Sequence, residues 1–284
     1  MDGPLLIFGR NGQLARALRR SALADGLSVR IVGSSDCDLA ESPEAAASCI
    51  EGVRGVVNAT AFTHVDEAET RTHANRNLNA TAPGVMAVAC AKRGVPFVHM
   101  STDYVFSGQA GHVAPDAPTR PCNAYGAAKL AGERAVRAAG GNALILRTSW
   151  VFDGTGRNFV TTMRGLRGRD EVRVVDDQVG RPTYAGDLAQ ACLTALDRGW
   201  SGSCIEHFQG AGPEVSWAGF ADAIFEALGE PRPEVVRIPS QDYPTPAVRP
   251  KRSVLDVWGF TARFGMRPLD WREGLRLALA EEQA

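Results

Sequence analysis

The sequence lacks any run of about eighteen apolar residues, the length that a membrane span needs. Its N-terminus, MDGPLLIFGR, lacks the basic start and long apolar stretch of a secretory signal. We therefore expect no membrane partner and a cytoplasmic location. An excess of one charge is also missing, since 31 Lys and Arg face 32 Asp and Glu, for a net charge of −1. That balance does not favour nucleic acid as a partner.

Clustered cysteine and histidine are absent as well. The six cysteines form no CxxC pair, and the five histidines show no metal-ligand spacing. Disulfide frameworks and zinc sites both need tighter clusters than this. We expect reduced thiols and no metal site.

The first half of the 284 residues alternates short apolar runs with helical patterns, which suits an α/β protein. The expected strands are 5–8, 29–32, 53–59, 96–100 and 143–147. The expected helices are 13–24, 43–51 with Ser42 as its cap, 83–93 and 123–139. This alternation predicts a Rossmann-type doubly wound parallel sheet with helices on both faces.

After Trp150 the rhythm becomes less regular. The expected helices are 159–167, 187–196, 217–228 and 270–281, and the expected strands are 171–175 and 203–208. We predict a first domain over 1–149, to which the chain returns near 184–208. The segments 150–183 and 209–284 would form a smaller C-terminal lobe.

A glycine turn joins the first expected strand to the first expected helix. Gly9 permits a tight turn, and Gly12 lets the backbone approach a pyrophosphate. The third small position is Ala15, which allows close packing of helix on strand. Phosphates would lie at the helix N-terminus, where free N–H groups and the helix dipole favour negative charge. The alternative is an ordinary strand–helix turn without a ligand.

The end of the second strand bears on the choice of dinucleotide. No acid follows Val32 directly, and the residues 33–35 are small. An acid there would bind a ribose 2′-hydroxyl and repel a 2′-phosphate, which Arg10 could meet instead. The pattern favours NADPH and leaves NADH open. Asp38 and Leu39 are placed to contact the adenine, or else form a helix-capping loop.

Tyr125 and Lys129 lie four apart on an expected helix, so their side chains share one face. A phenol has a reference pKa of about 10, and a nearby ammonium lowers that pKa. Such a tyrosine can give a proton to a ketone oxygen while a hydride reaches the carbon. The spacing alone is common, and a packed tyrosine beside a solvated lysine is the plain alternative.

Two further segments favour catalysis. Thr102 follows an expected strand at the carboxyl edge of the sheet, where open α/β folds place their ligands. Its hydroxyl can hydrogen-bond a carbonyl and stabilise developing negative charge, although a strand-end cap is the alternative. The segment 58–63 is also rich in small residues, which would let a cofactor pass close to the sheet edge. Together these features predict a nicotinamide-dependent oxidoreductase whose NAD(P)-binding domain is 1–149.

The glycine turn and the YxxxK spacing resemble the extended short-chain dehydrogenase/reductases. Seven segments, in order along nearly the whole chain, resemble the dTDP-4-dehydrorhamnose reductase family within that group. These segments are GRNGQLA, NATAFTHVDEAE, STDYVFSG, YGAAKLAGE, LRTSWVF, DDQVGRPT and YPTPAVRPKRS. The resemblance implies NAD(P)H-dependent reduction of the 4-keto group of dTDP-4-dehydro-β-L-rhamnose, with a dTDP-linked ketosugar as partner and the 150–183 and 209–284 lobe as its binding site.

The resemblance also implies roles for single residues. Tyr125 would be the proton donor, Lys129 its partner and Thr102 an aid at the carbonyl. The implied cofactor-binding residues are Gly9, Asn11, Gly12, Gln13, Leu14, Asp38, Leu39, Ala61, Phe62, Thr63, Tyr125 and Lys129. The implied substrate-binding residues are Val65, Thr102, Asp103, Trp150 and Arg249, with Arg249 on the diphosphate and a core role as the alternative for Trp150.

The chain departs from the family at positions that some members use to form magnesium-linked dimers. The helix after the glycine turn reads Leu14-Ala15-Arg16-Ala17-Leu18, without an acid, and position 186 is glycine. We therefore expect a monomer or a weak homodimer without metal. Two alternatives stay open for function: reduction of another dTDP-4-keto-6-deoxysugar, and a non-catalytic regulatory subunit on the same fold. The intact Thr102, Tyr125 and Lys129 argue against the second.

Overall fold

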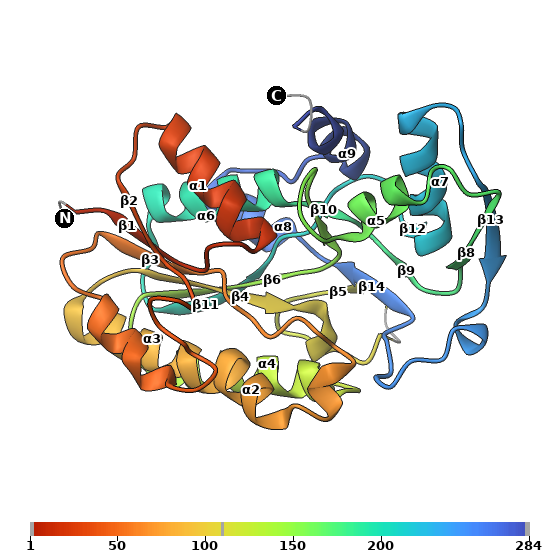
Figure 1. Ribbon diagram of the computed structural model, residues 1–284. Helices are drawn as coiled ribbons and strands as arrows, with labels where there is room; N and C mark the ends of the chain where they lie inside the picture. Colours follow the sequence, from red (N-terminus) through yellow and green to blue (C-terminus); the bar gives the residue numbers. More distant parts are fainter. Residues whose placement is uncertain (1–2, 109–110, 282–284) are drawn as a thin grey trace.

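The computed structural model describes residues 3–108 and 111–281. At its centre lies a six-stranded sheet in which every pair of neighbours is parallel (Figure 1). In spatial order the strands are β11 (Ser203–His207), β6 (Ala143–Thr148), β4 (Phe97–Thr102), β3 (Gly55–Asn58), β1 (Leu5–Phe8) and β2 (Val29–Val32). The four inner strands are buried along their whole length, which explains why apolar residues predominate in them.

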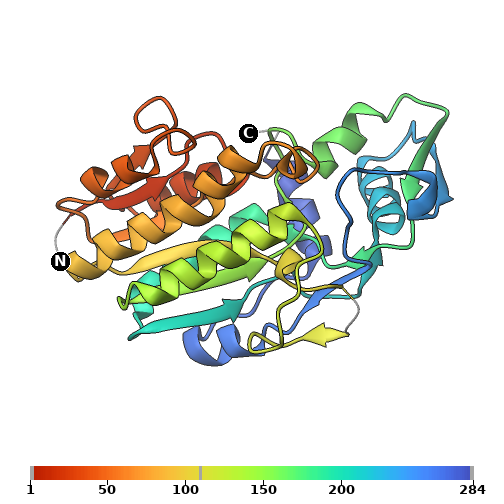
Figure 2. The same cartoon turned by 90° about the horizontal axis from the view of Figure 1, so that it is seen from below.

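Helices cover both faces of this sheet, and the period-two alternation of the strands decides which core each residue joins. In β1, Leu5 and Ile7 pack with α1 (Gln13–Ala24) and α6 (Ala185–Arg198). Leu6 and Phe8 point the other way, towards α3 (Ala82–Arg93). Figure 2 shows α3 beside α4 (Ala124–Ala138) on that second face, and α8 (Trp258–Phe264) packs with α6 on the first.

A third hydrophobic core lies at the opposite end of the molecule from β2 (Figure 1). It is built by α5 (Phe159–Gly165), α7 (Trp217–Leu228), α9 (Trp271–Ala280) and the parallel pair β8 (Glu171–Val175) and β13 (Glu234–Ile238). Two small sheets connect it to the main sheet. One pairs β7 (Val151–Phe152) with β10 (Thr183–Tyr184), and the other has the order β12 (Val215–Ser216), β9 (Val179–Gly180), β14 (Arg252–Leu255) and β5 (His112–Val113).

Most expected elements are present, and several boundaries need correction. The helix expected at 43–51 is a 3₁₀ helix, η1 (Pro43–Cys49), and the Ser42 side chain makes no capping bond. The strand expected at 96–100 continues to Thr102, so Thr102 ends β4 rather than following it. The strand expected at 203–208 joins the main sheet as β11, next to β6.

Several short elements were not expected. They are α2 (Thr72–Arg76), the π-helical turn η3 (Asn77–Thr81), β13, α8 and the 3₁₀ turns η2 (Glu67–Glu69), η4 (Asp103–Val105) and η5 (Ser240–Asp242). Elements of three to seven residues show too few periods for an apolar pattern to be recognised. No helix in the described part of the chain combines the length and apolarity needed to cross a membrane.

Candidate active site

The carboxyl end of β4 meets the first turn of α4, and this meeting brings Thr102 and Tyr125 together. Gly126 permits the approach, because a Cβ atom there would lie 2.2 Å from the Tyr104 carbonyl oxygen. The Thr102 side chain lies near the Tyr125 hydroxyl and favours its ionised form. The Tyr104 ring lies edge-on against the Tyr125 ring, with 5.6 Å between centroids. The two predicted catalytic hydroxyls thus lie together at the sheet edge.

The environment of Tyr125 differs from what the sequence predicts. Burial raises the pKa of the Tyr125 phenol to about 12. The Thr102 side chain lowers this pKa, whereas the Asp103 carboxylate raises it further. Lys129 does not reverse the change, since its ammonium donates to the Met100 carbonyl oxygen at 2.6 Å. The expected lowering of the Tyr125 pKa is therefore wrong for the ligand-free protein. A phenol that keeps its proton is still the form that a proton donor needs.

Lys129 lies one turn further along α4 and is 1% exposed. Burial lowers the pKa of its ammonium to about 8, and the nearby Glu133 carboxylate opposes that change. Glu133 is held in turn by Arg147, whose Nε and Nη2 donate to its two oxygens at 2.8 and 2.7 Å. Ser101 donates to Glu133 as well, at 2.5 Å. The helix face that carries the YxxxK pair thus continues into a buried ion pair.

Asp103 is a buried acid beside the catalytic hydroxyls, 4% exposed. It accepts hydrogen bonds from Thr102, at 3.0 Å, and from Ser253 on β14. Burial raises the pKa of the Asp103 carboxyl to about 6, although both hydroxyl bonds oppose this. The contact to Ser253 ties the end of the YPTPAVRPKRS segment to the sheet edge.

The glycine turn has the shape of a cradle for a dinucleotide. Gly9 has φ +117°, and a Cβ atom there would lie 3.3 Å from both Ala15 Cβ and the Ala59 carbonyl oxygen. A larger residue would therefore push α1 away from the sheet, whereas Gly12 is exposed and open to a ligand. These features fit a pyrophosphate on the backbone at the start of α1.

The other predicted cofactor residues line the same edge with different exposure. Asn11, Asp38 and Thr63 are exposed, whereas Gln13 and Ala61 are partly buried. Leu14, Leu39 and Phe62 are buried, so their side chains belong to the cores and mainly their backbone is left to face a ligand.

Arg10 lies over Gly33 at the end of β2, where the sequence predicts the adenosine ribose. A Cβ atom on Gly33 would lie 2.9 Å from Arg10 Nε, and Arg10 pairs with Asp36 at 2.5 Å. Asp36 also accepts the Gly33 N–H at 2.8 Å. The carboxylate at this strand end is therefore that of Asp36, four residues after Val32, and the sequence pattern did not indicate it. A cation and an acid thus lie together at the strand end that the sequence predicts to select between NADPH and NADH.

Trp150 adopts a strained backbone conformation at the entry to β7. Its φ of +48° is unusual for a bulky residue and requires support from its surroundings. The indole stacks on Trp217 with 3.6 Å between ring centroids and 10° between planes. On the β9 side, a Cβ atom on Gly180 would lie 2.9 Å from the Trp150 ring. The GRPT glycine therefore makes room for Trp150.

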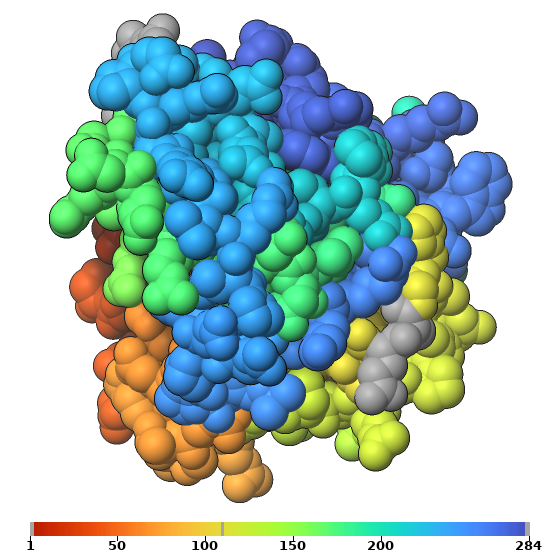
Figure 3. Space-filling model, turned by 90° about the vertical axis from the view of Figure 1, so that its right-hand side faces the viewer, coloured from red at the N-terminus to blue at the C-terminus, as the bar shows by residue number. Residues whose placement is uncertain are grey.

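Arg249, the predicted diphosphate ligand, is already paired. Its two terminal nitrogens donate to the Asp66 carboxylate at 2.9 and 2.7 Å, and one of them also donates to the Ala247 carbonyl oxygen at 2.9 Å. Figure 3 shows the orange segment and the blue loop side by side, in line with this ion pair. Val65, next to Asp66, is partly buried. The structure thus joins the VDEAE and PAVRP segments directly.

The chain is similar to known proteins over nearly its whole length. The family model described as RmlD substrate binding domain matches residues 3–284. A dTDP-4-dehydrorhamnose reductase of Burkholderia thailandensis is 40% identical over 296 residues, covering 98% of each chain. The chain belongs to the dTDP-4-dehydrorhamnose reductase family.

Solved structures of family members have the same fold. A dTDP-4-dehydrorhamnose reductase of Clostridium acetobutylicum matches with a TM-score of 0.91 and 33% identity, covering 99% of this chain and 100% of the other. The enzyme of Bacillus anthracis, solved in complex with NADP, matches with a TM-score of 0.91 and 29% identity over the same shares.

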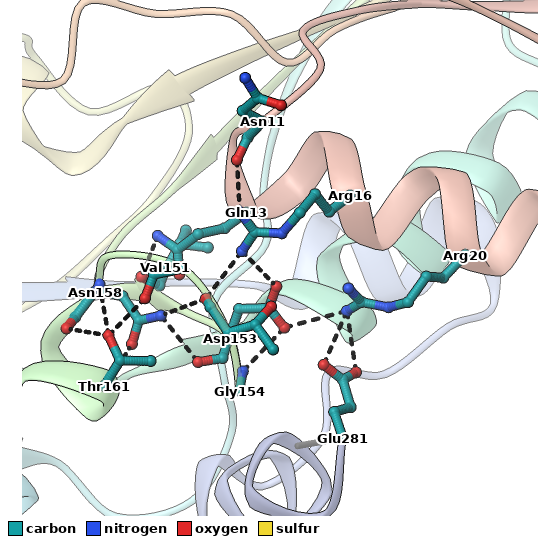
Figure 4. A network of polar contacts seen from close by, with 12 residues as sticks. Asn11, Gln13, Arg16, Arg20, Val151, Asp153, Gly154, Asn158, Thr161 and Glu281 are labelled. Atoms are coloured by element: carbon teal, nitrogen blue, oxygen red, sulfur yellow. Dashed lines mark hydrogen bonds and ion pairs between the residues drawn. The ribbon is translucent and has the colours of Figure 1, made fainter. Parts of the chain in front are cut away.

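The first turn of α1, where the resemblance places a magnesium ligand of some family members, carries no acid in this chain. Arg16 and Arg20 project from α1 towards Asp153 and Glu281 and already pair with them (Figure 4). The Tyr184 ring covers Gly186, where a Cβ atom would lie 2.5 Å from it. No group of three candidate ligands that could hold a metal ion occurs within residues 3–108 and 111–281.

Three buried asparagines, Asn75, Asn77 and Asn79, support the site and were not predicted from the sequence. Asn79 grips the Phe62 peptide from both sides, accepting its N–H at 3.1 Å and donating to its carbonyl oxygen at 3.0 Å. Asn75 accepts from Asn79 and donates to the Ala124 carbonyl oxygen at the start of α4. The Asn77 amide donates to the Ala40 carbonyl oxygen at 2.6 Å, beside the predicted adenine segment. The repeated asparagines in Asn75-Arg76-Asn77-Leu78-Asn79 were the available signal, because buried amides in a helix need partners.

Proposed function

We propose that the protein catalyses the NAD(P)H-dependent reduction of the 4-keto group of dTDP-4-dehydro-β-L-rhamnose to dTDP-L-rhamnose. The observation that carries the proposal is the packing of α4 against the end of β4, which places Tyr125 beside Thr102 at the sheet edge with Lys129 one turn further on. Membership of a family whose relatives bear this enzyme name supports the choice of substrate.

The chemistry divides between cofactor and protein. When bound, NADPH or NADH supplies a hydride to C4 of the sugar. Thr102 donates a hydrogen bond to the ketone oxygen, which stabilises the negative charge that develops there. Tyr125 gives its proton to that oxygen, completing the alcohol. The Lys129 ammonium, on the same helix face, stabilises the phenolate left behind.

The proposed binding residues surround this centre. The pyrophosphate would lie on Gly9, Asn11, Gly12 and the start of α1, and the nicotinamide half would pass the segment 61–63. Arg10 would meet a 2′-phosphate and Asp36 a 2′-hydroxyl, so the site suits both dinucleotides. Val65, Asp103 and Trp150 would surround the sugar. Arg249 would hold the diphosphate after exchanging or sharing its Asp66 partner.

We place this reaction in the cytoplasm, since the six cysteines are all free thiols, as in reducing compartments. We propose a monomer or a weak homodimer, because α1 has no acid in the turn where the resemblance implies a magnesium ligand of the dimeric family members.

A coupled assay tests the proposed function. The ketosugar is made from dTDP-glucose with the dehydratase and epimerase, and oxidation of NADH and of NADPH is followed in parallel. We expect turnover and dTDP-L-rhamnose as product. Tyr125→Phe should bind cofactor nearly as the wild type does and lose about 10²–10⁴-fold in turnover. Absence of turnover in the wild type would refute the proposal, and a different sugar product would favour the alternative ketosugar. Near-normal turnover of Tyr125→Phe would refute only its role as donor.

A further inference from the structure

Arg16 connects the glycine turn to the segment that follows Trp150. It lies on α1, in the first turn after the cradle, and is partly buried. Its guanidinium donates to the Asn11 carbonyl oxygen at 2.6 Å, to the Thr155 carbonyl oxygen at 2.9 Å and to the Asp153 carboxylate at 3.1 Å. Figure 4 shows Asn11 and Asp153 on opposite sides of the Arg16 guanidinium. One planar cation thus holds both segments.

The segment held by Arg16 is itself well anchored. Asp153 is fully buried, and its second oxygen accepts from Arg20 at 3.1 Å and from the Gly154 N–H at 3.0 Å. Asn158, the cap of α5, donates to the carbonyl oxygens of Asp153 and Thr155 at 2.9 and 3.1 Å. Because Asp153, Thr155 and Asn158 are joined by these hydrogen bonds, a displacement of Asp153 moves the whole segment that follows Trp150.

A second link starts inside the cradle. Gln13, the first residue of α1, donates to the Val151 carbonyl oxygen at 3.2 Å, directly after Trp150. The strained φ of Trp150 persists only while its neighbours hold it. The orientation of the indole thus depends on where the glycine turn and α1 lie.

The glycine at position 156 leaves space for the Arg16 guanidinium. Gly156 has φ +71°, and a Cβ atom there would lie 2.6 Å from the nearest guanidinium nitrogen. Arg16 Nη1 and Nη2 serve different segments, which requires the forked geometry of arginine. A lysine offers a single point charge and cannot reach both.

We infer that Arg16 is a positioning residue that couples the binding of the dinucleotide to the binding of the sugar. When the dinucleotide occupies the glycine turn, Arg16 orders the Trp150 segment, which faces the sugar. This inference rests on the proposed function for the location of both ligands. Ordering of the turn by a pyrophosphate fixes the Asn11 carbonyl, and Arg16 then fixes Asp153 and Thr155. Each ligand therefore strengthens the binding of the other, as reciprocal coupling requires.

Calorimetric titration of dTDP-L-rhamnose, with and without saturating NADPH, tests the coupling, because this product and the reduced cofactor do not react together. For the wild type we expect NADPH to tighten the binding of dTDP-L-rhamnose by about fivefold or more. In Arg16→Ala that ratio should fall below about twofold, with each ligand still binding alone. Arg16→Lys should give an intermediate ratio. The matched control is Arg19→Ala, on an exposed position of α1 with no hydrogen bond or ion pair among the described residues, and it should keep the full ratio.

The outcomes separate the inference from the proposed function. A full ratio in Arg16→Ala, or a ratio near one in the wild type, would overturn the coupling while leaving the reductase activity intact. Failure of the wild type to bind either ligand would overturn the proposed function itself. A purely structural role predicts a lower melting temperature with an unchanged ratio. Arg20 still pairs with Asp153 in Arg16→Ala; if that variant does not fold, Arg16→Lys decides by the same ratio.

Discussion

The buried ion pair beneath the active site leads to a prediction about stability and about pH. Glu133 and Arg147 are each 2% exposed and share two hydrogen bonds, at 2.8 and 2.7 Å. Glu133→Gln keeps the shape of the side chain and removes its charge. Arg147 would then stay buried without a carboxylate partner, although the Pro115 carbonyl oxygen would still accept from it at 2.9 Å.

The cost follows from the uncompensated charge. Removing one partner of a buried pair destabilises a protein by about 3–5 kcal/mol. We expect the lower end, about 3 kcal/mol, because the glutamine oxygen still accepts from one guanidinium nitrogen. At about 2 °C per kcal/mol for a chain of this size, the melting temperature should fall by about 6 °C.

The same change acts on Lys129. The Glu133 carboxylate raises the pKa of the Lys129 ammonium, which burial lowers to about 8. Without this carboxylate the pKa falls further, so the ammonium loses its proton at lower pH. Because the reaction leaves a phenolate beside Lys129, turnover should decline as pH rises through the Lys129 pKa. The alkaline limb of the pH–rate profile should therefore move to lower pH in Glu133→Gln.

Urea unfolding and a pH–rate profile test both parts. Arg134→Ala is the matched control, since Arg134 is the next residue of α4 and is exposed. It should change neither quantity. An unfolding free energy of Glu133→Gln within about 1 kcal/mol of the wild type would refute the argument from the buried charge. An unmoved alkaline limb would refute the electrostatic link to Lys129.

Two further variants test the packing and the acid at the sheet edge. Gly132→Ala places a Cβ atom 2.1 Å from the Asn79 carbonyl oxygen, so we expect a loss of about 1–3 kcal/mol in urea unfolding and weaker NADPH binding through the Asn79–Phe62 contact. Gly165→Ala, which has open space, should show neither effect. Burial raises the pKa of the Asp103 carboxyl to about 6 in the folded protein. The protonated carboxyl therefore contributes about 3 kcal/mol to the free energy of unfolding below about pH 4, and this contribution is lost as pH rises through 6. Asp103→Asn should remove that loss between pH 4 and 7, and an unchanged pH dependence of unfolding would count against this reading.

Local pattern was sufficient for much of the architecture. The inner strands are apolar because both of their faces are buried, and the long helices repeat their apolar face over several turns, so both were predictable. Their short counterparts were not, as the 3₁₀ helix Pro43–Cys49 and the π turn Asn77–Thr81 show. These segments are defined by what they pack against, including the Gly132 contact with Asn79.

The sequence by itself determined the helix face that carries Tyr125, Lys129 and Glu133, because residues four apart share a face in any α-helix. It also determined the glycine turn and its place between a strand and a helix. Only the tertiary structure decided which distant groups meet that framework. Ser253 reaches Asp103 across 150 residues, Arg249 reaches Asp66 across 183, and Arg16 reaches Asp153 across 137. The direction of each pKa change was likewise decided by burial, which depends on how the whole chain packs and which no local spacing records.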